Sequence, residues 1–319
     1  MMNWTKLYLF GVILLLSACE KIALLSTPQK QPIPSNNALA TKAELDFWTI
    51  FHHGQYNDIS KATYELTAAY LQNPNDPKLA AHLGFLHLWK ITEYQRSHHK
   101  NPMITNEIIL AKQFFSDAVK LDPKNPIYQG FLGDSQLIQG TIFKDKKEEV
   151  RGYFRLKKAI AAWPEFNYFT AGYPMSNLPA SSDHFKEGLE WQWLTLDYCA
   201  GKTINRQNPD YRTVMSHETT HGRKRACWNS WIAPYNFEGF FMNMGDMLVK
   251  SGDWKKAIII YNNAKIAKNY STWPYREELE HKIKNAQTNV KSYQLTSQTP
   301  DKTIMFNSGY GCMACHSNG

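Results

Sequence analysis

The chain has 319 residues, of which 43% are hydrophobic, and it carries a formal net charge of +8 with a sequence pI of about 9.0. A hydrophobic fraction of this size is ordinary for a chain with a packed core, and the length suits one large domain or an array of repeats. A positive chain attracts anionic partners, but this one has no basic block and no nucleic-acid motif, so we expect no nucleic-acid partner.

The first residues have the pattern of a targeting segment. Lys6 precedes the apolar run LYLFGVILLL, and the small residues of LSAC follow it and end at Cys19. A positive start, a short apolar core and small residues before a cleavage point are typical of a secretory signal. The alternative is an uncleaved anchor helix, although the apolar run is short for a membrane span.

Small residues directly before a cysteine resemble a bacterial lipobox. The resemblance implies that residues 1–18 are a signal peptide, that Cys19 is lipidated, and that the mature protein is anchored in the cell envelope, facing the periplasm. Because Glu20 rather than an aspartate follows the cysteine, the resemblance further implies the outer membrane. Residues 19–42 contain three prolines with Ser, Asn and Gln, and this composition predicts a tether.

The N-terminal repeats are predicted over residues 43–169, where three segments, the last of which runs on to residue 172, share one plan. In each, an amphipathic helix ends with Ala, a turn that contains Pro follows, and another helix begins. The segments are AYLQNPNDPKLAAHLGFLH (69–87), AVKLDPKNPIYQGFLGD (118–134) and AIAAWPEFNYFTAG (159–172). The repetition predicts stacked helical hairpins, because one hairpin cannot bury its apolar face alone.

These segments resemble the tetratricopeptide repeat, as does FFMNMGDMLVKSGDWKKAIIIYNNAKIA within residues 239–291. In this last unit Gly245, Trp254 and Tyr261 fall at consensus offsets. The resemblance implies an all-α, tetratricopeptide-repeat-like helical solenoid whose concave surface binds protein partners. Longer turns after His87 and around residues 144–147 depart from the repeat.

The repeat pattern fades in an aromatic-rich insert over residues 170–238. Apolar residues at helical spacing predict a helix over 184–199, with Gly201 as its stop. We expect the tryptophans of the insert to be core residues. Cys199 and Cys227 would pair in an oxidising compartment, and two buried thiols are the alternative. The tryptophans are Trp191, Trp193, Trp228 and Trp231.

The insert also contains HETTH, from His217 to His221, which matches the H-E-x-x-H pattern of zinc peptidases. A helix from Asn208 to Gly222 would put both imidazoles on one face, as zinc ligands, with Glu218 beside them to activate water. Thr219 stands where such enzymes usually carry an apolar residue, and no third ligand is evident. We therefore favour hydrogen-bonded imidazoles, with distal haem ligands or a zinc peptidase as alternatives.

Residues 292–319 form a predicted flexible strap that carries Cys312, Cys315 and His316 as C-x-x-C-H, the attachment signature of c-type haem. The two thiols bond the porphyrin vinyl groups, and the histidine binds iron as the proximal ligand. A disulfide or thiol redox pair lacks its usual βαβ context, and a closed zinc site needs a fourth ligand.

The residues after the motif are too few for a free-standing cytochrome domain, so a sixth ligand from the protein has to come from the strap or from the helical body. Otherwise the iron is five-coordinate or takes water or a small ligand. Met305 is uncomfortably near the motif in sequence. The better candidates are His184, His217 and His221, followed by Met242, Met244 and Met247.

The sequence thus predicts a lipid-anchored envelope protein with one covalent haem c. Its expected task is electron transfer with a redox partner or haem-dependent assembly, and a single haem without an evident substrate pocket favours electron transfer over catalysis. The alternatives are a haem-free scaffold lipoprotein and the zinc peptidase.

Overall fold

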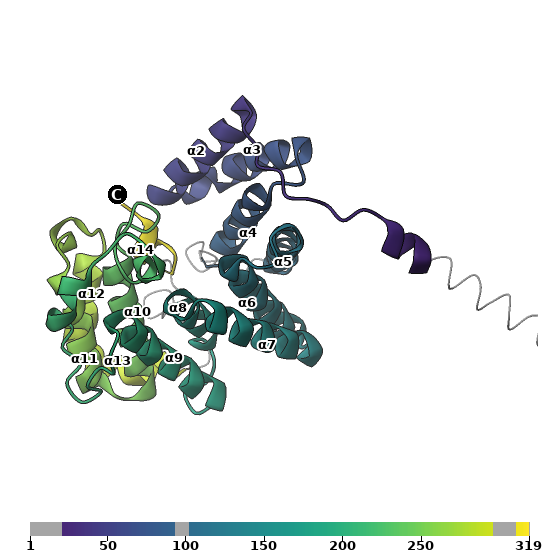
Figure 1. Cartoon of the computed structure of the whole chain (residues 1–319). Coiled ribbons are helices and arrows are strands. Elements are labelled where there is room, and N and C mark those ends of the chain that lie inside the picture. Colours follow the sequence, from purple (N-terminus) through teal and green to yellow (C-terminus); the bar gives the residue numbers. More distant parts are fainter. Residues whose placement is uncertain (1–20, 93–101, 296–310, 319) are drawn as a thin grey trace, which may run out of the picture.

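The fold is described from a computed structural model, over residues 21–92, 102–295 and 311–318, and it is all-helical, with no strand in these ranges (Figure 1). Most helices pack against their neighbours in the chain, and none in these ranges is long and apolar enough to cross a membrane. The signal peptide, Cys19 and Met305 lie outside the described residues. Residues 21–26 are helical. The α-helices that follow are α2 (Ala38–His52), α3 (Ile59–Gln72), α4 (Pro77–Thr92), α5 (Ile104–Leu121), α6 (Pro126–Phe143), α7 (Lys146–Ala162), α8 (Pro164–Met175), α9 (Asp183–Ala200), α10 (Asn236–Ser251), α11 (Trp254–Asn263), α12 (Arg276–Lys284), α13 (Ala286–Tyr293) and α14 (Met313–His316).

The tether is shorter than the sequence predicts, and part of it is bonded to the fold. Helix α2 begins at Ala38 because the Asn37 side chain accepts from the N–H of Ala40 and caps the first turn. Upstream, the N–H of Ile33 donates to the Asn75 carbonyl at 2.9 Å. The N–H of Ser35 donates to Asp76 Oδ2 at 2.7 Å. The last residues of the tether therefore lie against the turn between α3 and α4.

One turn geometry recurs three times, where α3, α5 and α7 end. The C-cap residues have φ/ψ of −140°/81°, −130°/77° and −150°/82°, and each donates its N–H to the carbonyl of an alanine four residues back. These are the alanines on which the predicted repeat rests, and a proline begins the next helix each time. The pairs are Asn73 and Ala69, Asp122 and Ala118, and Trp163 and Ala159.

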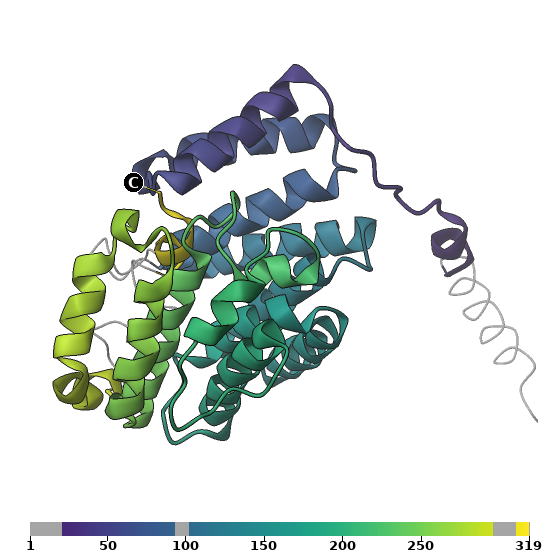
Figure 2. The same ribbon diagram turned by 60° about the vertical axis from the view of Figure 1, so that its left-hand side comes forward.

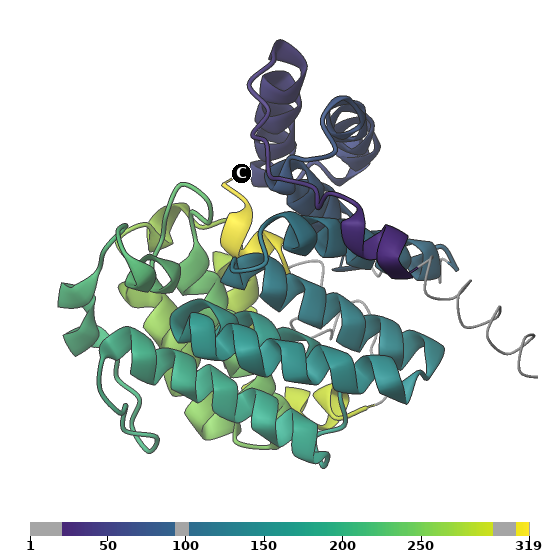
Figure 3. The ribbon, with the colours of Figure 1, turned by 45° about the vertical axis from the view of Figure 1, so that its right-hand side comes forward.

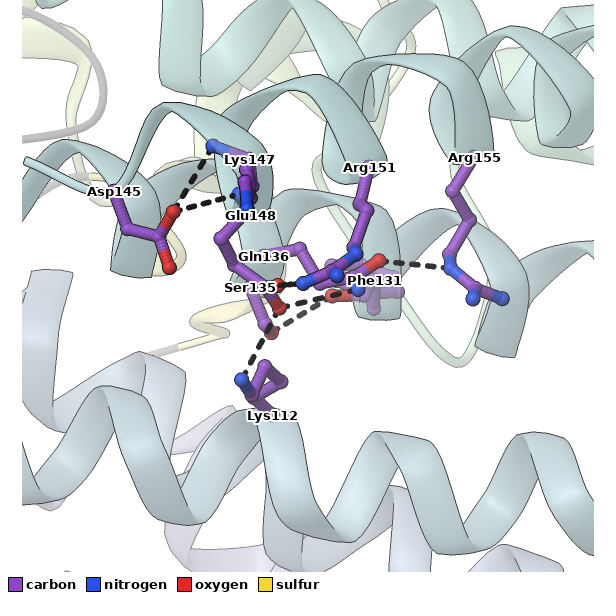
Figure 4. A network of polar contacts seen from close by, with 9 residues as sticks. All are labelled: Lys112, Phe131, Ser135, Gln136, Asp145, Lys147, Glu148, Arg151 and Arg155. Carbon is purple, nitrogen blue, oxygen red and sulfur yellow. Dashed lines mark hydrogen bonds and ion pairs between the residues drawn. The ribbon is translucent and has the colours of Figure 1, made fainter. Parts of the chain in front are cut away.

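A buried polar network joins three helices in the middle of the array (Figure 4). The Glu148 carboxylate of α7 accepts from Lys112 of α5 at 3.1 Å and from Gln136 of α6 at 3.2 Å. Arg151, one turn further along α7, donates to the same carboxylate at 3.0 Å. Since Glu148 is only 7% exposed, these partners compensate its removal from water.

The predicted helix over 184–199 is confirmed as α9, which packs on α8. Ser182 caps its start, and Gly201 ends it with a φ of +69°. Residues 201–235 are irregular apart from two 3₁₀ helices, η3 (Arg212–His217) and η4 (Arg223–Cys227). The expectation of buried tryptophans holds for three of the four, whereas Trp231 is 67% exposed.

Candidate functional site

The C-terminal motif is docked into the body of the protein. It forms the short helix α14, which lies between α2 and α10 (Figures 2 and 3). The Cys315 carbonyl accepts from the N–H of Tyr235 at 2.9 Å, and the Ala314 carbonyl accepts from Trp273 Nε1 at 2.8 Å. Adjacent residues of α14 enter two different cores: Met313 packs with the core of α2–α4, and Ala314 with the core of α10–α13.

Close approach of α10 and α14 depends on Gly239. A Cβ on this residue would lie 2.9 Å from both the carbonyl carbon and the oxygen of Ala314, and closer still to the Cys315 sulfur. Cys315 is consequently 3% exposed, and its Sγ donates to the Asn236 carbonyl at 3.9 Å. Cys312 is half-buried, with its Sγ 3.4 Å from the Thr92 hydroxyl.

The imidazole of His316 is held by the main chain. Its Nδ1 lies 2.8 Å from the Ile232 carbonyl, and because a carbonyl only accepts, Nδ1 carries the proton. Within the described ranges Nε2, on the other side of the ring, has no hydrogen-bond partner. Burial lowers the pKa of His316 to about 4, so the ring is neutral at pH 7.

This donor set fits covalent haem. Two thiols separated by two residues suit the two vinyl groups, and a neutral imidazole with an available Nε2 is a metal ligand. A histidine that binds a metal through one nitrogen usually donates its other N–H to a carbonyl or carboxylate, as His316 does to Ile232.

The predicted helix around HETTH is wrong. The chain makes the 3₁₀ helix η3, which ends at His217, and residues 218–222 are not helical. Both histidines are exposed, and Glu218 pairs with Lys268 at 2.6 Å. In the described ranges, no group of three or more His, Cys, Asp or Glu side chains lies close enough together to hold a metal ion.

The other candidate sixth ligands occupy unrelated environments. His184 is on α9, its side chain is 66% exposed, and its ring lies 3.6 Å from Glu187. The three methionines of α10 are fully buried; they are Met242, Met244 and Met247. Cys199 and Cys227 form a disulfide that links α9 to η4.

The residues that position the motif were missed at the sequence level. Ile232, Gly239 and Thr92 belong to no motif, and their contacts with the motif span long sequence separations. His52 was missed as well: its main-chain carbonyl accepts from the N–H of Asn318 at 2.7 Å. No protein-family model, curated protein or solved structure matches the chain.

Proposed function

We propose that the protein carries one covalent haem c, bound to Cys312 and Cys315, with His316 as the proximal iron ligand, and that it serves electron transfer or haem-dependent assembly. The observation that carries this proposal is the state of His316, whose Nδ1 is fixed on the Ile232 carbonyl while Nε2 is available. A motif present by chance in a strap would have no reason to be held in this way.

Each residue of the motif has its own task in this proposal. The two thiols add across the vinyl double bonds, each S–H hydrogen going to the vinyl carbon that sulfur does not bond. The bound haem supplies a one-electron couple. Gly239 lets the attachment helix approach α10, and the Ile232 carbonyl orients the proximal imidazole.

The same proposal includes a tetratricopeptide-repeat-like array, a lipid anchor on Cys19 and an envelope location facing the periplasm. The recurring C-cap geometry after α3, α5 and α7 supports the repeat. The concave face of such an array would bind protein partners, among them the redox partner. The tether would place this array next to the outer membrane.

The test is expression of the full chain in a bacterium that has a c-type haem-attachment system. We expect the mass to increase by one haem that denaturation does not remove, and a Soret band in the purified protein. The Cys312→Ala/Cys315→Ala double variant should lose both. A colourless wild-type protein of unmodified mass would overturn the proposal.

A haem-free scaffold is the second candidate, favoured by one observation. Met313, Ala314 and Cys315 are at most 3% exposed, so the side chains of the motif themselves fill part of the core. If the protein is a haem-free scaffold, the Cys312→Ala/Cys315→Ala variant keeps its protein partners. If the protein carries haem, the same variant loses its redox activity.

A further inference from the structure

The Ile232 carbonyl accepts a second hydrogen bond, from His52 at the end of α2. The His52 Nε2 lies 3.1 Å from this oxygen, which also accepts from His316 Nδ1 at 2.8 Å. A carbonyl oxygen has two lone pairs and can accept both bonds. The two imidazoles therefore meet at one atom, although they come from opposite ends of the chain.

His52 is placed firmly enough to act through this contact. It is 6% exposed, and its ring lies 5.2 Å from the Trp48 ring and 5.4 Å from the Trp231 ring. Its own carbonyl accepts from the N–H of Asn318, two residues after His316. His52 thus contacts the site twice, through its main chain and through its ring.

We propose that His52 is a positioning residue that tunes the proximal ligand by sharing the Ile232 carbonyl. This inference rests on the proposed function, because it concerns His316 as an iron ligand. Two donors draw on the electron density of one oxygen, so each of the two bonds is weaker than it would be alone.

The shared carbonyl predicts the direction in which His52 shifts the reduction potential of the haem. A stronger bond from Nδ1 to a carbonyl gives the imidazole more anionic character, which favours the oxidised iron. Because His52 weakens that bond, it raises the reduction potential. Removing the N–H donor of His52 should strengthen the hydrogen bond from His316 Nδ1 to the Ile232 carbonyl and lower the reduction potential.

Three variants of the haem-loaded full chain test the inference. His52→Phe keeps an aromatic ring against Trp48 and Trp231 but removes the donor, whereas His52→Gln keeps an N–H donor of similar reach. His53→Phe is the matched control, because His53 bonds the Thr49 carbonyl instead. We expect a lower midpoint potential for His52→Phe only, with wild-type values in His52→Gln and His53→Phe.

Two further measurements separate tuning from damage. The haem content and the Soret absorbance per protein should be equal in all variants, and Cys315 in the haem-free chains should react with a thiol reagent at the wild-type rate. If His52→Phe binds haem normally and keeps the wild-type potential, the inference is overturned while the proposed function stands. If the wild-type chain takes up no haem, the proposed function itself fails.

Discussion

Replacing Gly239 with alanine should release the C-terminal motif from the body of the protein. The new Cβ would lie 2.9 Å from the carbonyl carbon and oxygen of Ala314, a separation that real Cβ atoms essentially never show. Besides the Cys315 side chain, the obstacle includes the main chain of Ala314, which cannot rotate aside as a flexible side chain can. Helix α14 therefore has to move away from α10.

The expected size of the effect follows from the buried surface of α14. Burial of the Met313 side chain contributes about 1.5–3 kcal/mol, and each of the hydrogen bonds from Tyr235 and Trp273 adds about 1 kcal/mol. The loss of conformational entropy in residues 311–318 opposes these contacts. A clash costing about 1–3 kcal/mol should raise the undocked population about 5-fold to 150-fold.

The assay is the reaction rate of Cys315 with a thiol reagent in the folded, haem-free chain, with Cys19 and Cys312 replaced by serine. Alanine in a helix interior gains about 1 kcal/mol over glycine, so we expect the melting temperature to change little while Cys315 becomes reactive. Gly133→Ala is the matched control, because its Cβ would meet Leu156 at 2.9 Å in the contact between α6 and α7. A Gly239→Ala protein that is folded and whose Cys315 reacts at the parental rate refutes the reasoning.

Two further predictions concern buried charge. Burial raises the pKa of Glu238 from 4.5 in the unfolded chain to about 7, so the contribution of this residue to stability is full below about pH 4.5 and is lost as the pH rises through 7, a loss of about 3 kcal/mol. Urea unfolding at pH 5 and pH 8 should show this fall in the wild type and its loss in Glu238→Gln; a wild-type protein that is equally stable at both values contradicts it. The buried Lys282 contacts the buried Asp246 carboxylate at 3.0 Å. Lys282→Met would leave this carboxylate buried without its cationic partner, and we expect it to lower the free energy of unfolding by about 3–5 kcal/mol. The double change Lys282→Met/Asp246→Asn should recover part of that loss, and equal stability of the single and double variants would count against the argument.

The sequence predicted those parts of the fold that depend on neighbouring residues. The ends of α3, α5 and α7 were foreseeable because an alanine and a following proline act within a few positions. The limits of α9 were foreseeable from Gly201 and the helical spacing of its apolar residues. Such signals are local, and in the described residues they agree with the helix ends that the structure shows.

The helix predicted around HETTH was wrong because contacts with residues distant in the sequence determine the main chain there. The Asn263 side chain of α11 accepts from the N–H of Tyr211 at 3.1 Å and donates to the Pro209 carbonyl at 2.6 Å, which fixes the main chain where the helix was expected to begin. Lys268 then holds Glu218 at 2.6 Å. The docking of α14 was equally hidden, because Gly239 and Ile232 carry no sequence signal for a partner about 80 residues away.

The insertion of Met313 among the side chains of α2–α4 also bears on how the molecule is made. Thr92 and Cys312, which touch in the folded protein, are 220 residues apart. A ribosome adding about 5–20 residues each second needs on the order of ten seconds or more to cover that distance. The apolar side chains of α2–α4 that Met313 covers consequently stay uncovered until the C-terminal residues are present and docked, and a chaperone would find exposed apolar surface there.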